Sequence, residues 1–329
     1  MSENKFSDPR RRFLGGILGG LAATALPSAA HAEPAVATGE LPMRVLGKTG
    51  ARVTAIGFGA WKFYMIPEDT ALRLIDAAVD AGINYLDTAH DYFTSETVCG
   101  RALRGKRQKV FLTTKTKERT RAGVERQLAE SLRNLQTDYV DLYKMHVVSQ
   151  KEEVEQIFGP NGAMEAFVQA KKEGKVRYIG FSGHFDPEVH AAMIGRYDFD
   201  AVLMPLNAAD PHYVSFEKGV LPRAVEKQMG IIAMKIFADA MLLRSITVDE
   251  CLRYTLSLPV TCAIMGWTTL GQLEDNLRIA RNFKPLTAEE KTALLAKTAN
   301  IRGPHLEYYK KPSERATASR IGPALSLYG

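Results

Sequence analysis

The feature that most constrains the fold of this chain is a regular alternation of short apolar runs with longer amphipathic segments. The apolar runs are rich in β-branched and aromatic residues and have the length of buried strands. Each is followed by a segment with helical spacing, and the predicted helices are residues 68–81, 95–103, 121–134, 162–173, 187–195, 217–229, 248–258 and 270–281. In residues 68–81, for example, apolar side chains recur every three or four positions, and Gly82 follows as a typical helix terminator. The eight predicted strands are residues 56–61, 83–87, 110–115, 139–146, 176–182, 201–207, 231–237 and 262–267.

An alternation of this kind predicts a parallel sheet whose strands are joined by crossover helices. An open doubly wound sheet and a closed barrel would both produce it. Gly57 and Gly59 lack the third glycine of the dinucleotide-binding fingerprint, which disfavours the open sheet. Eight units within residues 56–281 favour an α/β fold of the closed (β/α)8 TIM barrel type.

Two further segments complete the predicted architecture. Strand-like residues flank the turn at 47–50, which predicts an N-terminal β-hairpin that covers the bottom of the barrel. Residues 284–329 contain three turns with proline and predict a C-terminal loop-rich tail that folds over the top or side of the barrel.

The first 32 residues have the layout of a signal peptide. Three arginines, Arg10 to Arg12, precede an apolar stretch at 13–26, and a small-residue cleavage pattern ends at Ala32. The arginines with the following Phe13-Leu14 resemble a twin-arginine export signal. The resemblance implies contact with the twin-arginine export machinery, cleavage after Ala32, a periplasmic location and no stable membrane insertion. An uncleaved anchor is the alternative.

The leader sets the predicted domain boundaries. We expect a signal peptide at residues 1–32, a linker at 33–42 and the barrel at 43–329. The formal net charge is +6, and the body has no basic block beyond the short run at 104–107, so we do not expect nucleic acid as a partner. The three cysteines form no metal-binding or paired pattern, which predicts unpaired thiols and no metal site.

Three successive predicted strands end in reactive side chains. Asp87 ends the second strand and Tyr92 follows it, while Lys115 and His146 end the third and fourth. The carboxyl ends of barrel strands meet at one rim, where the active sites of such barrels lie. Because buried charges need partners, we expect Asp87 to pair with Lys115. Each residue alone also has a structural explanation, as a strand-end cap, a packed phenol, a surface lysine or a core imidazole.

Five segments together resemble the aldo-keto reductase family. Residues 83–92 are similar to its signature around the catalytic aspartate and tyrosine, 111–115 to its lysine strand, and 141–146 to its histidine strand. Residues 174–182 resemble its fifth barrel strand, and 272–277 the element that meets the adenine half of the nucleotide. The segments occur in the family's order, so the joint signal is more specific than any one of them.

The resemblance implies a catalytic tetrad of Asp87, Tyr92, Lys115 and His146. Tyr92 would protonate the oxygen of a carbonyl that receives a hydride from a nicotinamide. Lys115, held by Asp87, would lower the pKa of the phenol. His146 would bind and orient the substrate oxygen. We use the name tetrad for these four residues below.

The implied cofactor is NADP, with NAD as the alternative. The sequence departs from the family at three places on this side: Gly183 replaces the usual asparagine, Met234 replaces a stacking tyrosine, and residues 266–271 carry no cation. The residues that the resemblance assigns to cofactor binding are Ser182, Asn207, Met234, Lys235, Phe237, Gly266, Thr268, Gln272, Glu274 and Asn276.

The sequence therefore predicts an exported oxidoreductase. It would transfer a hydride between NAD(P) and a small aldehyde or ketone, or the corresponding alcohol. The alternative is a non-catalytic nucleotide- or partner-binding barrel that retains the tetrad. Titration with reduced nicotinamide nucleotide separates the two, because only the enzyme also turns over carbonyl compounds.

Overall fold

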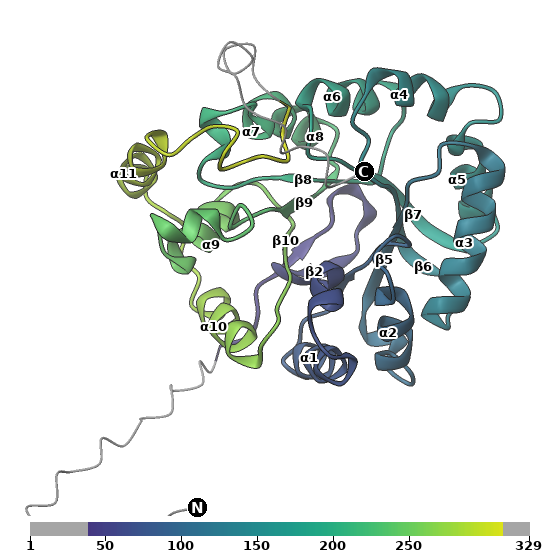
Figure 1. Cartoon of the computed structure of the whole chain (residues 1–329), viewed down its shortest axis with the longest axis horizontal. Helices are drawn as coiled ribbons and strands as arrows, with labels where there is room; N and C mark the ends of the chain where they lie inside the picture. The colour runs from purple at the N-terminus through teal and green to yellow at the C-terminus, as the bar shows by residue number, and fades with distance from the viewer. Residues whose placement is uncertain (1–38, 312–329) are drawn as a thin grey trace, which may run out of the picture. The chain divides into compact units, whose positions relative to one another are not determined.

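The computed structural model describes residues 39–311. Within them, eight parallel strands close into a barrel in the order β10-β3-β4-β5-β6-β7-β8-β9, as predicted, and the helices surround it (Figure 1). The barrel strands are β3 (Ile56–Gly59), β4 (Tyr85–Asp87), β5 (Phe111–Thr116), β6 (Val140–Met145), β7 (Val176–Ser182), β8 (Ala201–Pro205), β9 (Gly230–Met234) and β10 (Cys262–Met265).

The helices lie close to their predicted positions, with three differences. The helix expected at 217–229 is broken in two because Pro222 begins a new helix. Helix α4 follows β6 unpredicted, and the expected loop-rich tail contains helix α11. The helices are α1 (Glu68–Asp80), α2 (Ser95–Ala102), α3 (Arg121–Leu135), α4 (Lys151–Phe158), α5 (Ala163–Lys172), α6 (Pro187–Arg196), α7 (Phe216–Gly219), α8 (Leu221–Glu226), α9 (Val248–Ser257), α10 (Leu270–Arg281) and α11 (Ala288–Ala299).

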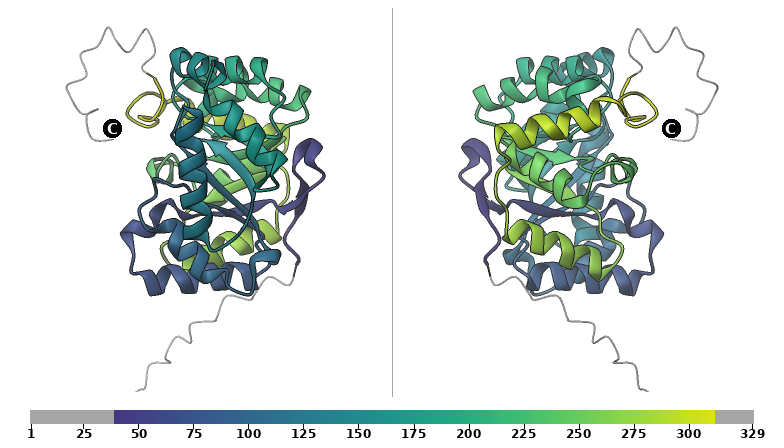
Figure 2. Two further views of the ribbon diagram at one scale, coloured as in Figure 1. Left: turned by 90° about the vertical axis from the view of Figure 1, so that its right-hand side faces the viewer. Right: turned by 90° about the vertical axis from the view of Figure 1, so that its left-hand side faces the viewer.

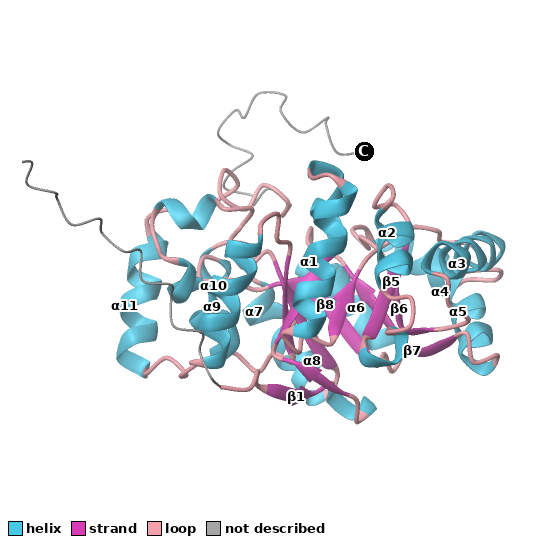
Figure 3. Ribbon diagram, turned by 90° about the horizontal axis from the view of Figure 1, so that it is seen from below, coloured by secondary structure: helices cyan, strands magenta, loops and turns pink. Residues whose placement is uncertain are grey.

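The predicted hairpin, β1 (Met43–Val45) and β2 (Arg52–Thr54), covers the end of the barrel where the strands begin. Leu46 at its turn is fully buried and packs with Ile232 and other inward side chains of the lower barrel. The approach is so close that a Cβ on Gly230 would collide with the side chain of Leu46. Figures 2 and 3 show this hairpin at one end of the barrel and the C-terminal loops at the other.

The C-terminal segment, residues 303–311, packs on the upper side of the barrel. The imidazole of His184 donates to the carbonyl of Tyr309 at 3.0 Å, and the amide of Lys311 donates to that of Phe185 at 2.8 Å. The predicted position of the tail is confirmed as far as residue 311. The rest of the tail, the signal peptide at 1–32 and residues 33–38 of the linker lie outside the described residues.

One expectation about residue chemistry holds within residues 39–311. Cys99, Cys251 and Cys262 are buried and unpaired, as the sequence predicts. No described helix is both long and apolar enough to cross a membrane. In the same part of the chain, no group of three or more potential ligands gathers into a metal site.

Candidate active site

The structure brings the tetrad together at the upper rim of the barrel. Asp87 is the last residue of β4, and one of its carboxylate oxygens lies 2.6 Å from the ammonium of Lys115 on β5. Both side chains are almost completely buried. The expected pairing of carboxylate and ammonium is therefore present, and it compensates two charges that would otherwise be costly to bury.

A second ammonium, which the sequence analysis did not assign, shares the same carboxylate. Lys144 on β6 is fully buried, forms an ion pair with Asp87 and donates to the hydroxyl of Thr113 at 2.6 Å. Burial would raise the pKa of Asp87, but Lys115 and Lys144 together hold it at about 2. The pKa of Lys144 is lowered to about 8, mainly by burial, although Asp87 opposes the shift.

Tyr92, the predicted proton donor, lies beside two other members of the tetrad. Its hydroxyl is 3.3 Å from the ammonium of Lys115 and 3.5 Å from Nε2 of His146. We expected Lys115 to lower the pKa of this phenol. Lys115 does act in that direction, but burial acts more strongly and raises the pKa above its ordinary value. The hydroxyl therefore keeps its proton at neutral pH and is available as a donor.

His146 follows β6, and a carboxylate contacts Nδ1 of its imidazole. Its Nδ1 lies 2.8 Å from one oxygen of Asp91, and the other oxygen lies 2.9 Å from the ammonium of Lys117. Burial lowers the pKa of His146 to about 4, against the opposing effect of Asp91, so the imidazole is neutral at neutral pH.

The backbone around His146 is fixed by a buried arginine. The guanidinium of Arg119 donates to the carbonyl of His146 at 2.7 Å and to that of Val147 at 3.2 Å, and it forms an ion pair with Glu153 of α4. Val147 has φ = 53°, a left-handed conformation that is strained for a β-branched residue. Arg119 therefore stabilises the turn that presents the imidazole.

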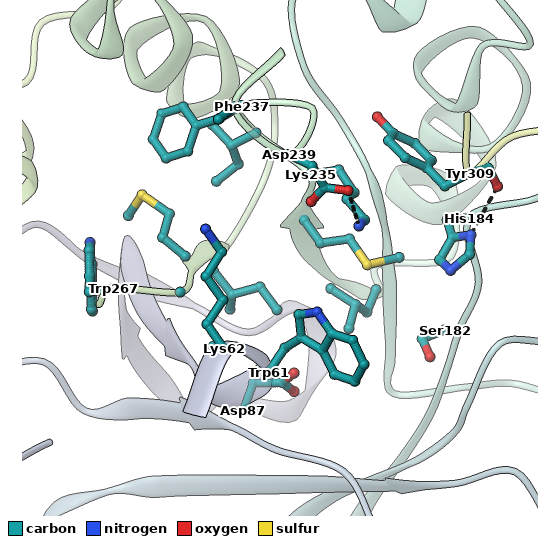
Figure 4. Close-up of a pocket in the computed structure, with 18 of the residues that line it drawn as sticks. Trp61, Lys62, Asp87, Ser182, His184, Lys235, Phe237, Asp239, Trp267 and Tyr309 are labelled. Atoms are coloured by element: carbon teal, nitrogen blue, oxygen red, sulfur yellow. Dashed lines mark hydrogen bonds and ion pairs between the residues drawn. The ribbon is translucent and has the colours of Figure 1, made fainter. Parts of the chain in front are cut away.

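A large cavity of about 2080 Å³ opens above the tetrad, which lines its floor. Its walls come from the connection after β3, the loop after β9, the start of α10 and the C-terminal segment. Figure 4 shows Trp61 and Lys62, the ion pair of Lys235 with Asp239, and the hydrogen bond of His184 with Tyr309 around this cavity.

The structure places seven of the ten predicted cofactor residues on the cavity wall and three elsewhere. Asn207 is fully buried, and its amide donates to Lys235, Glu307 and Tyr309, so it ties the C-terminal segment to the barrel. Thr268 and Glu274 also lie off the wall. The seven on the wall are Ser182, Met234, Lys235, Phe237, Gly266, Gln272 and Asn276.

The residues present fit a dinucleotide. The cavity runs from the tetrad to the beginning of α10, where backbone N–H groups and the helix dipole favour an anion. Lys62, Lys235 and Arg278 bring cationic side chains to the wall. Lys235 is paired there with Asp239, and Arg278 with Asp275. The loop at 266–271 has no cation, and Arg278 is contributed about two helical turns further on, within α10.

Four residues near the tetrad were missed from the sequence: Asp91, Lys117, Arg119 and Lys144. A signal for Lys144 exists, because Leu142, Lys144 and His146 alternate along one strand and so share its inward face. Asp91 and Lys117 each lie within a few residues of a predicted catalytic residue. Arg119 is far from His146 in the sequence, and nothing in its own segment points to the contact.

Comparison with known proteins shows which family this sequence and this fold are similar to. The sequence matches the aldo/keto reductase family over residues 55–250. The uncharacterized oxidoreductase YqkF of Bacillus subtilis is 28% identical over 303 residues, which cover 78% of this chain and 96% of that protein. The holo form of the aldo-keto reductase AKR11C1 from Bacillus halodurans is 27% identical, with a TM-score of 0.69 over 79% of this chain and 96% of its own. An aldo/keto reductase from Klebsiella pneumoniae, solved with NADP and acetate, is 24% identical and shares the fold, with a TM-score of 0.64 over 78% of this chain and 95% of its own.

Proposed function

Because the chain belongs to the aldo/keto reductase family and is a nicotinamide-dependent oxidoreductase, we propose that the tetrad interconverts a small aldehyde or ketone and its alcohol. The observation that carries the proposal is the position of the Tyr92 hydroxyl on the floor of the cavity, between Lys115 and His146. A single protonated phenol flanked by a cation and an imidazole is suited to give a proton to a carbonyl oxygen.

Each member of the tetrad then has a distinct role. Tyr92 donates its proton to the substrate oxygen as negative charge develops there. Lys115 stabilises the phenolate that remains, through the contact at 3.3 Å. Asp87 raises the pKa of Lys115 above its ordinary value, although burial alone would lower it, and so keeps the ammonium charged. His146 positions the substrate oxygen.

NADP is the proposed cofactor, with NAD as the alternative. When bound, the nicotinamide supplies or accepts the hydride. Met234, Gln272 and Asn276 would hold the nucleotide along the wall of the cavity. Arg278, whose side chain is half exposed at that wall, offers a guanidinium to a phosphate group. The NADP complex of the Klebsiella pneumoniae relative supports this choice.

The proposal is tested by replacing the proton donor alone. In Tyr92→Phe, we expect the rate of carbonyl reduction to fall by about 100-fold or more, as is typical when an acid catalyst is lost, while NADPH binds with nearly unchanged affinity. Steady-state kinetics and NADPH fluorescence titration give the two quantities. Tyr178→Phe is the matched control, because that hydroxyl donates to Thr49 at the opposite end of the barrel.

The same experiment separates the two candidate functions. Nucleotide binding by the unmodified protein without turnover of any carbonyl compound favours a non-catalytic nucleotide-binding barrel. Turnover that persists in Tyr92→Phe removes Tyr92 from the donor role.

The proposal includes export to the periplasm by the twin-arginine machinery. It is supported by the arginine run, the apolar stretch and the cleavage pattern that ends at Ala32. We expect the full chain to appear in the periplasmic fraction, shortened to begin at Glu33. Replacement of Arg10, Arg11 and Arg12 by lysine should retain it in the cytoplasm at full length. Equal export of both chains would contradict the signal type.

A further inference from the structure

A dinucleotide in this cavity has to cross the mouth of the barrel. Its phosphates are expected at the start of α10, which follows β10, whereas its reacting ring must reach the tetrad at the ends of β4, β5 and β6. In the closed strand order, β6 lies opposite β10. The ring therefore ends beside β6 and its neighbour β7, and side chains at the ends of these two strands are placed to hold it.

The surface on which this ring would lie is apolar. Leu203, Met234 and Ile264 line the cavity from β8, β9 and β10. These side chains can pack against the face of a nicotinamide. The carboxamide on the edge of that ring is polar, however, and needs hydrogen-bond partners once it leaves water. Such partners have to come from the rim around the apolar surface.

The end of β7 restricts which side chains can serve as partners. Ser182 is its last residue, and the hydroxyl gives its single hydrogen to the carbonyl of Met145 at 3.3 Å. The next position leaves no room for a side chain, because a Cβ on Gly183 would lie 2.5 Å from Cε1 of the buried His190. The following residue, His184, is therefore the first after β7 whose side chain can reach a ligand with a donor.

His184 is held in one orientation by the C-terminal segment. Its Nδ1 donates to the carbonyl of Tyr309 at 3.0 Å, and the two rings meet edge to face with their centroids 5.9 Å apart. A carbonyl oxygen only accepts, so Nδ1 carries a hydrogen whatever the charge of the ring. Nε2 has no hydrogen-bond partner among residues 39–311 and faces the cavity, whose wall His184 helps to form (Figure 4).

A primary carboxamide is complementary to this nitrogen. It has an NH2 group that donates and an oxygen that accepts, so it can bond to Nε2 with or without a hydrogen on that atom. We infer that His184 binds the carboxamide of the nicotinamide and so fixes the ring beside Tyr92. The inference rests on the proposed function and adds a cofactor-binding residue that the family resemblance did not assign.

Two substitutions separate the roles of the two ring nitrogens. Asparagine places its amide nitrogen near the position of Nδ1, so His184→Asn can keep the bond to Tyr309 but does not reach the cavity. Glutamine places its amide near the position of Nε2, so His184→Gln again offers the carboxamide a donor and an acceptor. His212→Asn is the matched control, because that imidazole bonds to the hydroxyl of Thr298 away from the cavity wall.

Calorimetric titration compares NADP+ with two ligands that lack the carboxamide. One is the analogue with a methyl group in its place, and the other is 2′-phospho-ADP-ribose, which lacks the whole ring. We expect the Kd of NADP+ to rise by roughly tenfold in His184→Asn, as the loss of one hydrogen bond in a buried site produces. His184→Gln should restore most of this affinity, and the Kd values of the other two ligands should stay the same in every variant.

Thermal unfolding checks that each variant is folded. His184→Phe, which keeps the shape of the ring, takes the place of His184→Asn if that variant is unstable. For a protein that binds NAD+ instead, the same ligands without the 2′-phosphate are used.

Unchanged binding of NADP+ in His184→Asn, or equal weakening of NADP+ and 2′-phospho-ADP-ribose, overturns the inference. Absence of binding of both NADP+ and NAD+ to the unmodified protein overturns it as well. Failure of the proposed function has a different signature. In that case the nucleotide binds in a manner that depends on His184, but no carbonyl compound is turned over.

Discussion

Asp87 is a single buried carboxylate that faces two buried ammonium groups, Lys115 and Lys144. The pKa shifts of the two lysines have opposite signs. The pKa of Lys115 is raised, with Asp87 and Tyr92 acting against burial, whereas the pKa of Lys144 is lowered to about 8 because burial dominates. The charged form of Lys144 is therefore destabilised by folding, whereas the charged form of Lys115, which contacts Tyr92, is stabilised.

The opposite shifts predict a pH dependence of stability. Below pH 8 Lys144 is charged in both the folded and the unfolded chain, and the folded state bears the full cost of burying it. Between pH 8 and its ordinary pKa of 10.5, the folded chain has released this proton and the unfolded chain has not. The contribution of Lys144 to the free energy of unfolding should then rise by roughly 3 kcal/mol.

The measurement compares unfolding by urea at several pH values for the unmodified protein and Lys144→Met. The difference between the two free energies should shift in favour of the unmodified protein as pH rises through this window. Lys172→Met, on the exposed face of α5, should show no such trend. A difference that stays constant with pH would contradict the assigned shift.

At the residue scale, the resemblance to the aldo-keto reductase family predicted the tetrad, and three of its members come at the ends of successive predicted strands. The structure brings the four side chains into one cluster. It did not predict Asp91 or Lys144. The partners of these two, His146 and Asp87, are more than fifty positions away along the chain. Such a contact depends on strand order and register, which a local pattern does not contain.

At the scale of elements, the C-terminal segment is held to the barrel by a buried ion cluster. The ammonium of Lys310 lies 2.6 Å from Asp210 and 2.8 Å from Glu307, and all three side chains are inaccessible. Asp210 also accepts from the backbone at the start of α7. One lysine thus connects the end of the described chain to the loop after β8 and to the wall of the cavity.

Removal of this lysine should therefore be costly. Lys310→Met leaves the Asp210 carboxylate buried without its cation, and we expect a loss of roughly 3–5 kcal/mol in the free energy of unfolding. Lys311→Met is the neighbouring control. Its ion pair with Asp186 is only partly buried, so it should lose about 1 kcal/mol or less. Equal losses of the free energy of unfolding in the two variants, measured by urea unfolding, would contradict the role assigned to Lys310.

The sequence predicted where strands and most helices lie, but it did not predict helix α11 or the break between α7 and α8. Strands and most helices follow from periodicity, which reports the buried face of each element directly. Helix α11 was missed although Thr287 and Glu290 form a capping box at its start, a local signal that was available. The break between α7 and α8 likewise follows from Pro222, which cannot continue a helix.

At the scale of the whole described barrel, the apolar hairpin contacts lie at one end and the charged candidate active site lies at the other. The hairpin and its apolar contacts seal the end where the strands begin. The charged groups, the strained Val147 turn and the large cavity lie at the end where the strands finish. The fold could be predicted because an eightfold alternation admits few architectures. The substrate could not be predicted, because the cavity wall is assembled from segments that are far apart in the sequence.

Hydride transfer in this cavity, beside Tyr92, can be followed in a single-turnover reaction with nicotinamide nucleotide deuterated at C4. We expect the alcohol product to carry one deuterium on the former carbonyl carbon, by mass spectrometry, and Tyr92→Phe to form almost none in the same time. Nucleotide that binds the unmodified protein while every carbonyl compound remains free of deuterium would show that the cavity does not catalyse this transfer.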